Sequence, residues 1–207
     1  MGTFVRSCVL LIAFLGFNSV ASGAELEHED MKGRWGLGVN FGDAFPLDDD
    51  GGSGFHTEGR IIYGIMDQVA LGFETGFLDF DYKIEDTDFG ALEGVPFFAT
   101  VQWRHPFIVR DRKATLYLVS GLGAISWRFD ESDGVRRLNE QIEAGTAFGA
   151  KGAVGVDFFL GEKWAINVEW SFVNSTTKVE FKVPGIRAQE TVDTDYWVLG
   201  GGVKYLI

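Results

Sequence analysis

Residues 34–42 read Arg-Trp-Gly-Leu-Gly-Val-Asn-Phe-Gly and alternate strictly in character. The odd positions carry large apolar side chains, and the even positions carry small or polar ones. A period of two residues is typical of a β-strand with one apolar face. The alternation recurs in seven further segments, at residues 56–65, 69–82, 95–109, 115–129, 146–160, 164–172 and 196–207. The sequence therefore predicts eight strands, and no segment has the pattern of an amphipathic helix.

The links between these segments alternate in length. The short links are residues 66–68, 110–114 and 161–163. The long, polar links are residues 46–54, 84–94, 130–145 and 182–195. Bacterial outer-membrane barrels have short periplasmic turns and long outer loops. We therefore predict an all-β fold over residues 33–207, an eight-stranded antiparallel up-and-down transmembrane β-barrel with both termini in the periplasm and the long loops extracellular.

Side-chain volume indicates which face of this barrel meets lipid. A soluble barrel would point its large apolar side chains inward, but eight strands enclose little space. The opposite face is rich in glycine and small polar residues, which suits a narrow interior. Segment 115–129 is ambiguous because both of its faces are apolar. We expect Tyr117, Val119, Ile125 and Trp127 to face lipid, which would place Ser120, Ser126 and Arg128 inside.

The inward register then contains nine charged residues, four acidic and five basic. Buried charges are tolerated when they are paired and are costly when they are not, so we expect a network of ion pairs across the lumen. Its members are Glu58, Arg60, Glu74, Arg104, Arg128, Lys151, Asp157, Glu169 and Lys204. Aromatic residues near strand ends suit the membrane interfaces. The predicted belt contains Trp35, Trp103, Trp127, Trp164, Trp197 and Tyr205.

The start of the chain is typical of a secretory signal peptide. Arg6 precedes an apolar run at residues 8–17, and small residues follow up to Ala24. This arrangement predicts a signal peptide at residues 1–24 and a polar lead-in at residues 25–32. The apolar run is too short for a spanning helix. Cys8 is the only cysteine, so the mature chain would form no disulfide.

Charge and missing motifs argue against several classes of function. The chain has 30 acidic and 18 basic residues, which argues against nucleic acid because phosphate binding needs clustered Lys and Arg. The acidic run at residues 48–54 lacks the spaced ligands of an EF-hand, so we expect no metal and no cofactor. His56 is followed by Thr57 and Glu58 rather than by a His-x-Ser pairing, and we expect no catalysis. A lipid-modifying enzyme barrel and a soluble, lipocalin-like periplasmic carrier stay as alternatives.

The mature chain resembles the small outer-membrane β-barrel families, namely the OmpA-like membrane domain and the OmpX-like and OmpW-like proteins. Besides the rhythm of strands and loops, its ending Gly-Gly-Gly-Val-Lys-Tyr-Leu-Ile at 200–207 looks like their C-terminal assembly signal. Gly202 and Tyr205 fall at the glycine and aromatic positions, whereas Ile207 replaces the usual final aromatic residue.

The resemblance implies several partners and roles. The partners are the barrel-insertion machinery of a Gram-negative bacterium, outer-membrane lipid and lipopolysaccharide. The roles are structural, adhesive or narrow-pore functions without catalysis. For OmpW-like proteins, passage of small hydrophobic compounds is proposed. We find no pattern in the sequence that predicts an apolar lining of the lumen.

Overall fold

The computed structural model describes residues 31–47, 52–84, 87–131, 141–183 and 186–207. The predicted signal peptide and most of the polar lead-in lie outside these residues. Within them the chain forms ten strands: β1 (Trp35–Pro46), β2 (Gly54–Met66), β3 (Val69–Ile84), β4 (Thr87–Val109), β5 (Arg112–Glu131), β6 (Gln141–Ala144), β7 (Thr146–Phe159), β8 (Trp164–Val183), β9 (Ile186–Asp193) and β10 (Tyr196–Leu206).

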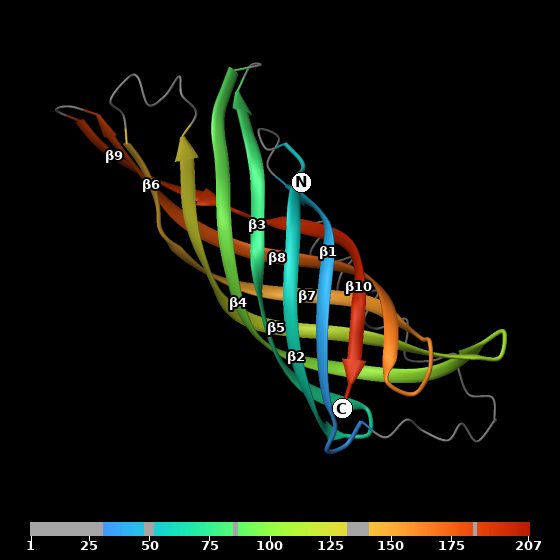
Figure 1. The fold of residues 1–207 in the computed structure, drawn as a ribbon. Helices are drawn as coiled ribbons and strands as arrows, with labels where there is room; N and C mark the ends of the chain where they lie inside the picture. The colour runs from blue at the N-terminus through green and yellow to red at the C-terminus, as the bar shows by residue number, and fades with distance from the viewer. Residues whose placement is uncertain (1–30, 48–51, 85–86, 132–140, 184–185) are drawn as a thin grey trace.

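Eight of these strands close into a barrel (Figure 1). The order is β1, β2, β3, β4, β5, β7, β8 and β10, and each strand is antiparallel to its neighbours. β10 pairs with β1 on one side and with β8 on the other, which closes the ring. The predicted eight-stranded antiparallel up-and-down barrel is therefore confirmed. Among the described residues, no helix is long and apolar enough to cross a membrane.

The predicted long links are partly strand, which corrects their boundaries. β4 already begins at Thr87, β6 lies within the link at 130–145, and β9 lies within the link at 182–195. β6 and β9 both pair with the far end of β8. The β3–β4 and β8–β9 hairpins project at the upper end of the barrel in Figure 1, opposite the C-terminus. These parts of the sequence are rich in polar residues and were therefore predicted as loops, although the hydrogen-bonded pairing of strands continues through them.

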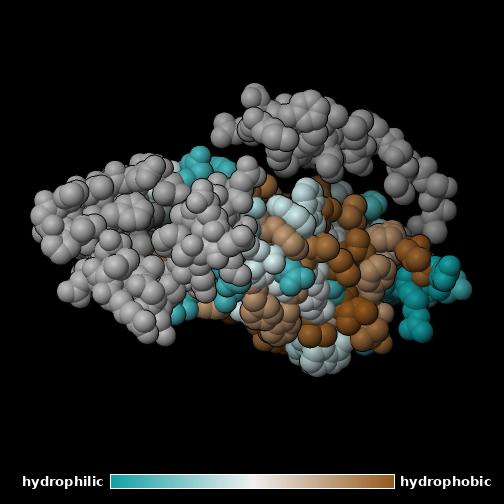
Figure 2. All heavy atoms as spheres, turned by 90° about the horizontal axis from the view of Figure 1, so that it is seen from above, coloured by the Kyte–Doolittle hydropathy of each residue, from teal (hydrophilic) through white to brown (hydrophobic). Residues whose placement is uncertain are grey.

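The apolar face of the barrel points outward, as predicted. Trp35, Leu37, Val39 and Phe41 on β1 are 44–52% exposed, whereas Asn40 between them is 7% exposed. Figure 2 shows apolar side chains gathered over the barrel wall, with hydrophilic residues at one end. An apolar exterior around a polar interior is the arrangement of a membrane barrel and the reverse of a soluble one.

The predicted register of β5 is wrong. Tyr117 and Ile125 are fully buried and Trp127 is 3% exposed, so these side chains point into the lumen. Glycines on the neighbouring strands leave room for two of them. A Cβ on Gly155 would lie 2.4 Å from the Tyr117 ring, and a Cβ on Gly94 would lie 2.7 Å from the Trp127 ring.

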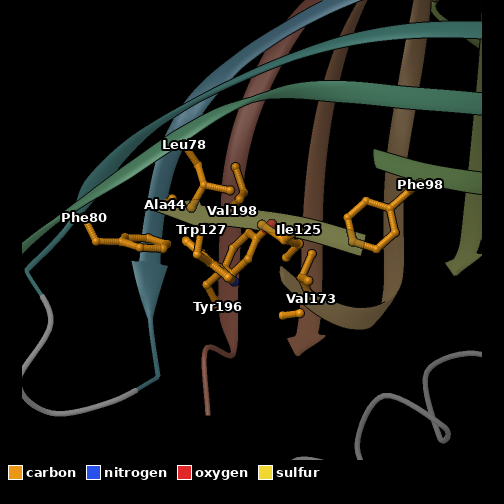
Figure 3. Close-up of a cluster of buried hydrophobic side chains, with 10 residues drawn as sticks. Ala44, Leu78, Phe80, Phe98, Ile125, Trp127, Val173, Tyr196 and Val198 are labelled. Carbon is orange, nitrogen blue, oxygen red and sulfur yellow. The ribbon is translucent and has the colours of Figure 1, made fainter. Parts of the chain in front are cut away.

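Two apolar clusters lie inside the barrel, contrary to the expectation of a lumen without apolar lining. The upper lumen cluster, at the long-loop end, consists of Ala44, Leu78, Phe80, Phe98, Ile125, Trp127, Ala147, Val173, Tyr196 and Val198 (Figure 3). The lower lumen cluster, at the short-turn end, consists of Met31, Ile62, Ala70, Phe159, Ala165 and Leu206. Met31 is held there because Gly33 donates a backbone hydrogen bond to Gly64, 2.8 Å long.

The corrected position of Trp127 predicts a difference in fluorescence quenching. The protein has six tryptophans, so variants that keep only Trp127 or only Trp164 isolate each signal. Brominated lipid quenches by contact. We expect it to quench Trp164, which is 54% exposed on the outer face, and to spare Trp127, which is 3% exposed. Equal quenching of the two variants would support the original prediction that Trp127 faces lipid.

Candidate functional site: an ion-pair network across the lumen

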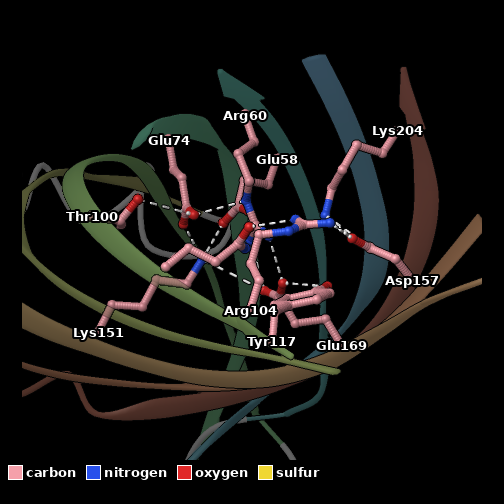
Figure 4. Close-up of polar contacts among 11 residues, drawn as sticks. Glu58, Arg60, Glu74, Thr100, Arg104, Tyr117, Lys151, Asp157, Glu169 and Lys204 are labelled. Atoms are coloured by element: carbon pink, nitrogen blue, oxygen red, sulfur yellow. Dashed lines mark hydrogen bonds and ion pairs between the residues drawn. The ribbon is translucent and has the colours of Figure 1, made fainter. Parts of the chain in front are cut away.

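Eight of the nine predicted lumen charges meet inside the barrel (Figure 4). Their side chains are 0–6% exposed. They come from six strands, β2, β3, β4, β7, β8 and β10. They meet because inward-facing positions on these strands lie at similar levels along the barrel axis. The eight are Glu58, Arg60, Glu74, Arg104, Lys151, Asp157, Glu169 and Lys204. We call this set the lumen network.

The upper part of the network joins three glutamates through two cations. Arg60 on β2 forms ion pairs of 2.7 Å each with Glu58, Glu74 and Glu169. Lys151 on β7 pairs with Glu58 and, at 2.6 Å, with Glu74. Its ammonium group also lies 3.8 Å from Glu169. Because β2 and β7 are not neighbours in the sheet, these bonds cross the lumen.

The lower part of the network is built on a single carboxylate. Asp157 on β7 accepts a 2.9 Å hydrogen bond from Arg104 on β4 and is 2.8 Å from the ammonium group of Lys204 on β10. Arg104 also donates a 2.8 Å hydrogen bond to Gln102. One acid and two bases therefore gather near the short-turn end, below three acids and two bases.

Tyr117 connects the two parts of the network, although it was expected to face lipid. Its hydroxyl donates a 2.9 Å hydrogen bond to Glu169 in the upper part. Its ring centre lies 4.4 Å from the ammonium group of Lys204 in the lower part, a distance at which a cation is attracted to the face of an aromatic ring. The sequence feature that could have indicated this inward position is Gly155, which pairs with Tyr117 on the neighbouring strand and leaves room for its ring.

Arg128 does not belong to the lumen network, which corrects its predicted position. It pairs with Glu93 at 3.1 Å, and its side chain is 75% exposed. The reason is the register of β5, in which Trp127 points inward and Arg128 outward. Among the described residues of the network this leaves four acids and four bases, so the paired charges balance.

The predicted aromatic belt is divided among three places. Trp35 contacts Tyr63 at 4.8 Å between ring centres, and Trp164 contacts Tyr205 at 4.7 Å, both on the outer face near the short turns. Trp103, which stacks on His105, pairs with Val69 directly after the β2–β3 turn and so lies near the short turns as well. Two members lie elsewhere: Trp197 stacks on Phe45 near the long-loop end, and Trp127 lies in the lumen.

The residues of the predicted assembly signal lie on or just beyond β10. Gly202 faces inward so close to β1 that an added Cβ would lie 2.0 Å from the carbonyl oxygen of Val39. Tyr205 lies on the outer face, and Ile207 is 60% exposed. Their use as an assembly signal stays a prediction. In the described part of the chain, no group of three or more His, Cys, Asp or Glu side chains is arranged to hold a metal ion.

Comparison with known proteins identifies similar barrels. A family model described as "Outer membrane protein beta-barrel domain" matches residues 10–205. Outer membrane protein W of Salmonella typhi is 23% identical over 208 residues, which cover 90% of this chain and 93% of that protein. The crystal structure of OprG from Pseudomonas aeruginosa has a TM-score of 0.72 at 16% identity, covering 85% of this chain and 96% of that one. The solid-state NMR structure of AlkL in lipid bilayers has a TM-score of 0.57 at 17% identity, with 92% and 96% covered.

Proposed function

The chain belongs to the outer membrane protein β-barrel domain family, and from this premise we propose that it is a non-catalytic barrel, closed along its axis, with a structural or adhesive role. The observation that carries the proposal is the lumen network. Arg60 and Lys151 tie β2 and β3 to the opposite wall through bonds of 2.6–2.7 Å. The upper and lower lumen clusters lie at either side of this layer, so a hydrated ion would meet three successive obstacles.

The orientation that fits this role has the short turns and both termini in the periplasm. The outer face is apolar along the middle of the strands, and charged side chains such as Asp43, Glu93 and Arg128 follow toward the long-loop end. Beyond them, β3, β4, β8 and β9 continue as paired strands. In this orientation the paired strands rise above the outer leaflet, where they would meet lipopolysaccharide and surface partners. The ending at 200–207 would be read by the barrel-insertion machinery.

The state of the buried titratable groups supports a role without catalysis. Each carboxylate of the lumen network already accepts hydrogen bonds or ion pairs from Arg60, Arg104, Lys151, Lys204 or Tyr117. A general base or nucleophile needs a reacting atom that a substrate can approach. Side chains that are 0–6% exposed and held in ion pairs are poorly placed for such a role.

The upper lumen cluster favours a second candidate function, the passage of small apolar molecules. Its ten members form an apolar interior at the long-loop end, above the lumen network. Phe80 and Trp127 each contact Tyr196 there, at 5.6 Å and 6.5 Å between ring centres. Apolar, aromatic linings are the usual surroundings of small-molecule sites. Such a molecule would enter among these side chains without crossing the charged layer.

Recordings in lipid bilayers test whether the axis is closed. We expect the wild-type barrel to give no current steps. Lys151→Ala should give small steps, because it removes the cation that joins β7 to Glu58 and Glu74. Lys113→Ala, at an exposed position beside the β4–β5 turn, is the matched control and should stay silent.

The outcomes separate the two candidate functions. Regular current steps from the wild-type protein would contradict a closed axis. Uptake of an apolar fluorophore into vesicles that contain the silent wild-type barrel, above the uptake into protein-free vesicles, would favour the passage of apolar molecules over a purely structural role.

A further inference from the structure

A small polar cavity lies at the junction between the lumen network and the upper lumen cluster. Its volume is about 10 Å³. It is lined by Glu169 of the network and by Val198 of the upper lumen cluster, with Asn40, His56 and Ser171 beside them. A single water molecule needs roughly 10–15 Å³ of such space, so the cavity has the size of one hydroxyl-type group.

Asn40, which lines this cavity, has a buried side-chain oxygen without a partner in the described part of the chain. Among the described residues, no group forms a hydrogen bond with the side-chain oxygen of Asn40, although the residue is only 7% exposed. This oxygen lies 2.3 Å from the position that a Cβ on Gly202 would occupy, so the side chain leans over the inner face of β10. Buried polar groups in native proteins are almost always satisfied by protein or by ordered water. The unpaired oxygen therefore indicates a missing donor.

The chemistry of the surroundings restricts what this donor is. The oxygen of Asn40 accepts only, so the occupant must donate a hydrogen bond. The eight charges of the network, counted over the described residues, already balance and are paired with one another. A further ion would enter without a counter-charge, which is costly in a buried site. A neutral group that both donates and accepts, with the size of a hydroxyl, meets all of these conditions.

We propose that this cavity is a binding site for one neutral hydroxyl group, which donates to Asn40 and lies against Ser171 and His56. The group is supplied by a resident water molecule, because a cavity of about 10 Å³ leaves no room for the apolar part of an alcohol. The proposal does not depend on whether the barrel passes apolar molecules, because the water needs no route for such a ligand.

Water-selective NMR of the whole mature barrel in lipid bicelles tests the site. We expect a cross-peak between water and the side-chain amide protons of Asn40 in a rotating-frame Overhauser spectrum. Its sign should be that of dipolar contact, which is opposite to the sign of a chemical-exchange cross-peak. Ser171→Val should remove the cross-peak, because the larger apolar side chain fills the cavity. Ser120→Val makes the same change on the exposed outer face of β5 and should leave the cross-peak intact.

Addition of 1-hexanol tests the size limit of the site. The water cross-peak should stay unchanged, and its loss together with a new contact from the alcohol to Asn40 would contradict a site for water alone. If Asn40 shows no contact with water, or if Ser171→Val keeps the water cross-peak, the proposal is wrong. Should Ser171→Val fail to fold, Asn40→Leu removes the acceptor, and the water contact should then be absent at His56.

Discussion

Replacing Arg60 with alanine is expected to lower the free energy of unfolding by about 3–5 kcal/mol, the usual cost of removing one partner from a buried ion pair. Arg60 is 2% exposed and contacts Glu58, Glu74 and Glu169 at 2.7 Å each. Without it, three buried carboxylates share only the ammonium group of Lys151. The measurement is urea unfolding of the barrel in lipid vesicles, followed by the shift in gel mobility between folded and unfolded protein.

Arg128→Ala is the matched control for this prediction. Its ion pair with Glu93 is exposed to solvent, and exposed pairs contribute less than about 1 kcal/mol. A second variant separates charge from packing. Arg60→Met combined with Glu169→Gln removes one charge of each sign and should recover part of the loss, because removing both partners costs less than removing one. If Arg60→Ala is no more harmful than Arg128→Ala, the lumen network does not stabilise the barrel.

The strands could be predicted from the sequence because one face of each strand meets lipid. The expected segments 69–82 and 146–160 differ from β3 and β7 by only one or two residues at their ends. By contrast, the expected segment 164–172 ends well before Val183, where β8 ends. Residues 174–178 of this strand are all polar. The alternation is therefore interrupted there, although β8 continues and pairs with β9.

β5 was predicted in the wrong register because its two faces are equally apolar. Leu116, Leu118 and Leu122 lie on one face and Tyr117, Ile125 and Trp127 on the other, and hydrophobicity alone does not separate these sets. The deciding feature is the pairing of Tyr117 with Gly155 and of Trp127 with Gly94. These glycines lie on other strands, so their effect depends on a register that local patterns do not specify.

The membership of the lumen network was easier to predict than its pairing. Inward charged residues follow from strand alternation, and eight of the nine expected residues lie in the lumen. The partners, however, are far apart in the sequence. Arg60 and Glu169 are separated by 109 positions, and they meet only because the closed barrel brings β2 opposite β8. Tyr117 joins the network for the same reason.

Placing arginine on the lipid-facing wall should produce the second large effect. Val101 lies toward the middle of β4 and is 48% exposed, whereas Val109 lies on the same face beside the short turn and is 41% exposed. An arginine at the bilayer midplane costs about 2–4 kcal/mol and one near the interface about 0–1 kcal/mol. We therefore expect Val101→Arg to lower the unfolding free energy in vesicles strongly and Val109→Arg to change it little.

This pair of variants tests the membrane interpretation because the two positions have similar exposure. If the outer wall were in contact with water, as in a soluble carrier, an arginine at either position would be solvated and the two variants would behave alike. A cost that depends on depth requires a low-dielectric layer around the middle of the wall. Equal unfolding free energies for the two variants would contradict lipid contact at Val101. A larger loss for Val109→Arg would place the apolar band nearer the short turns.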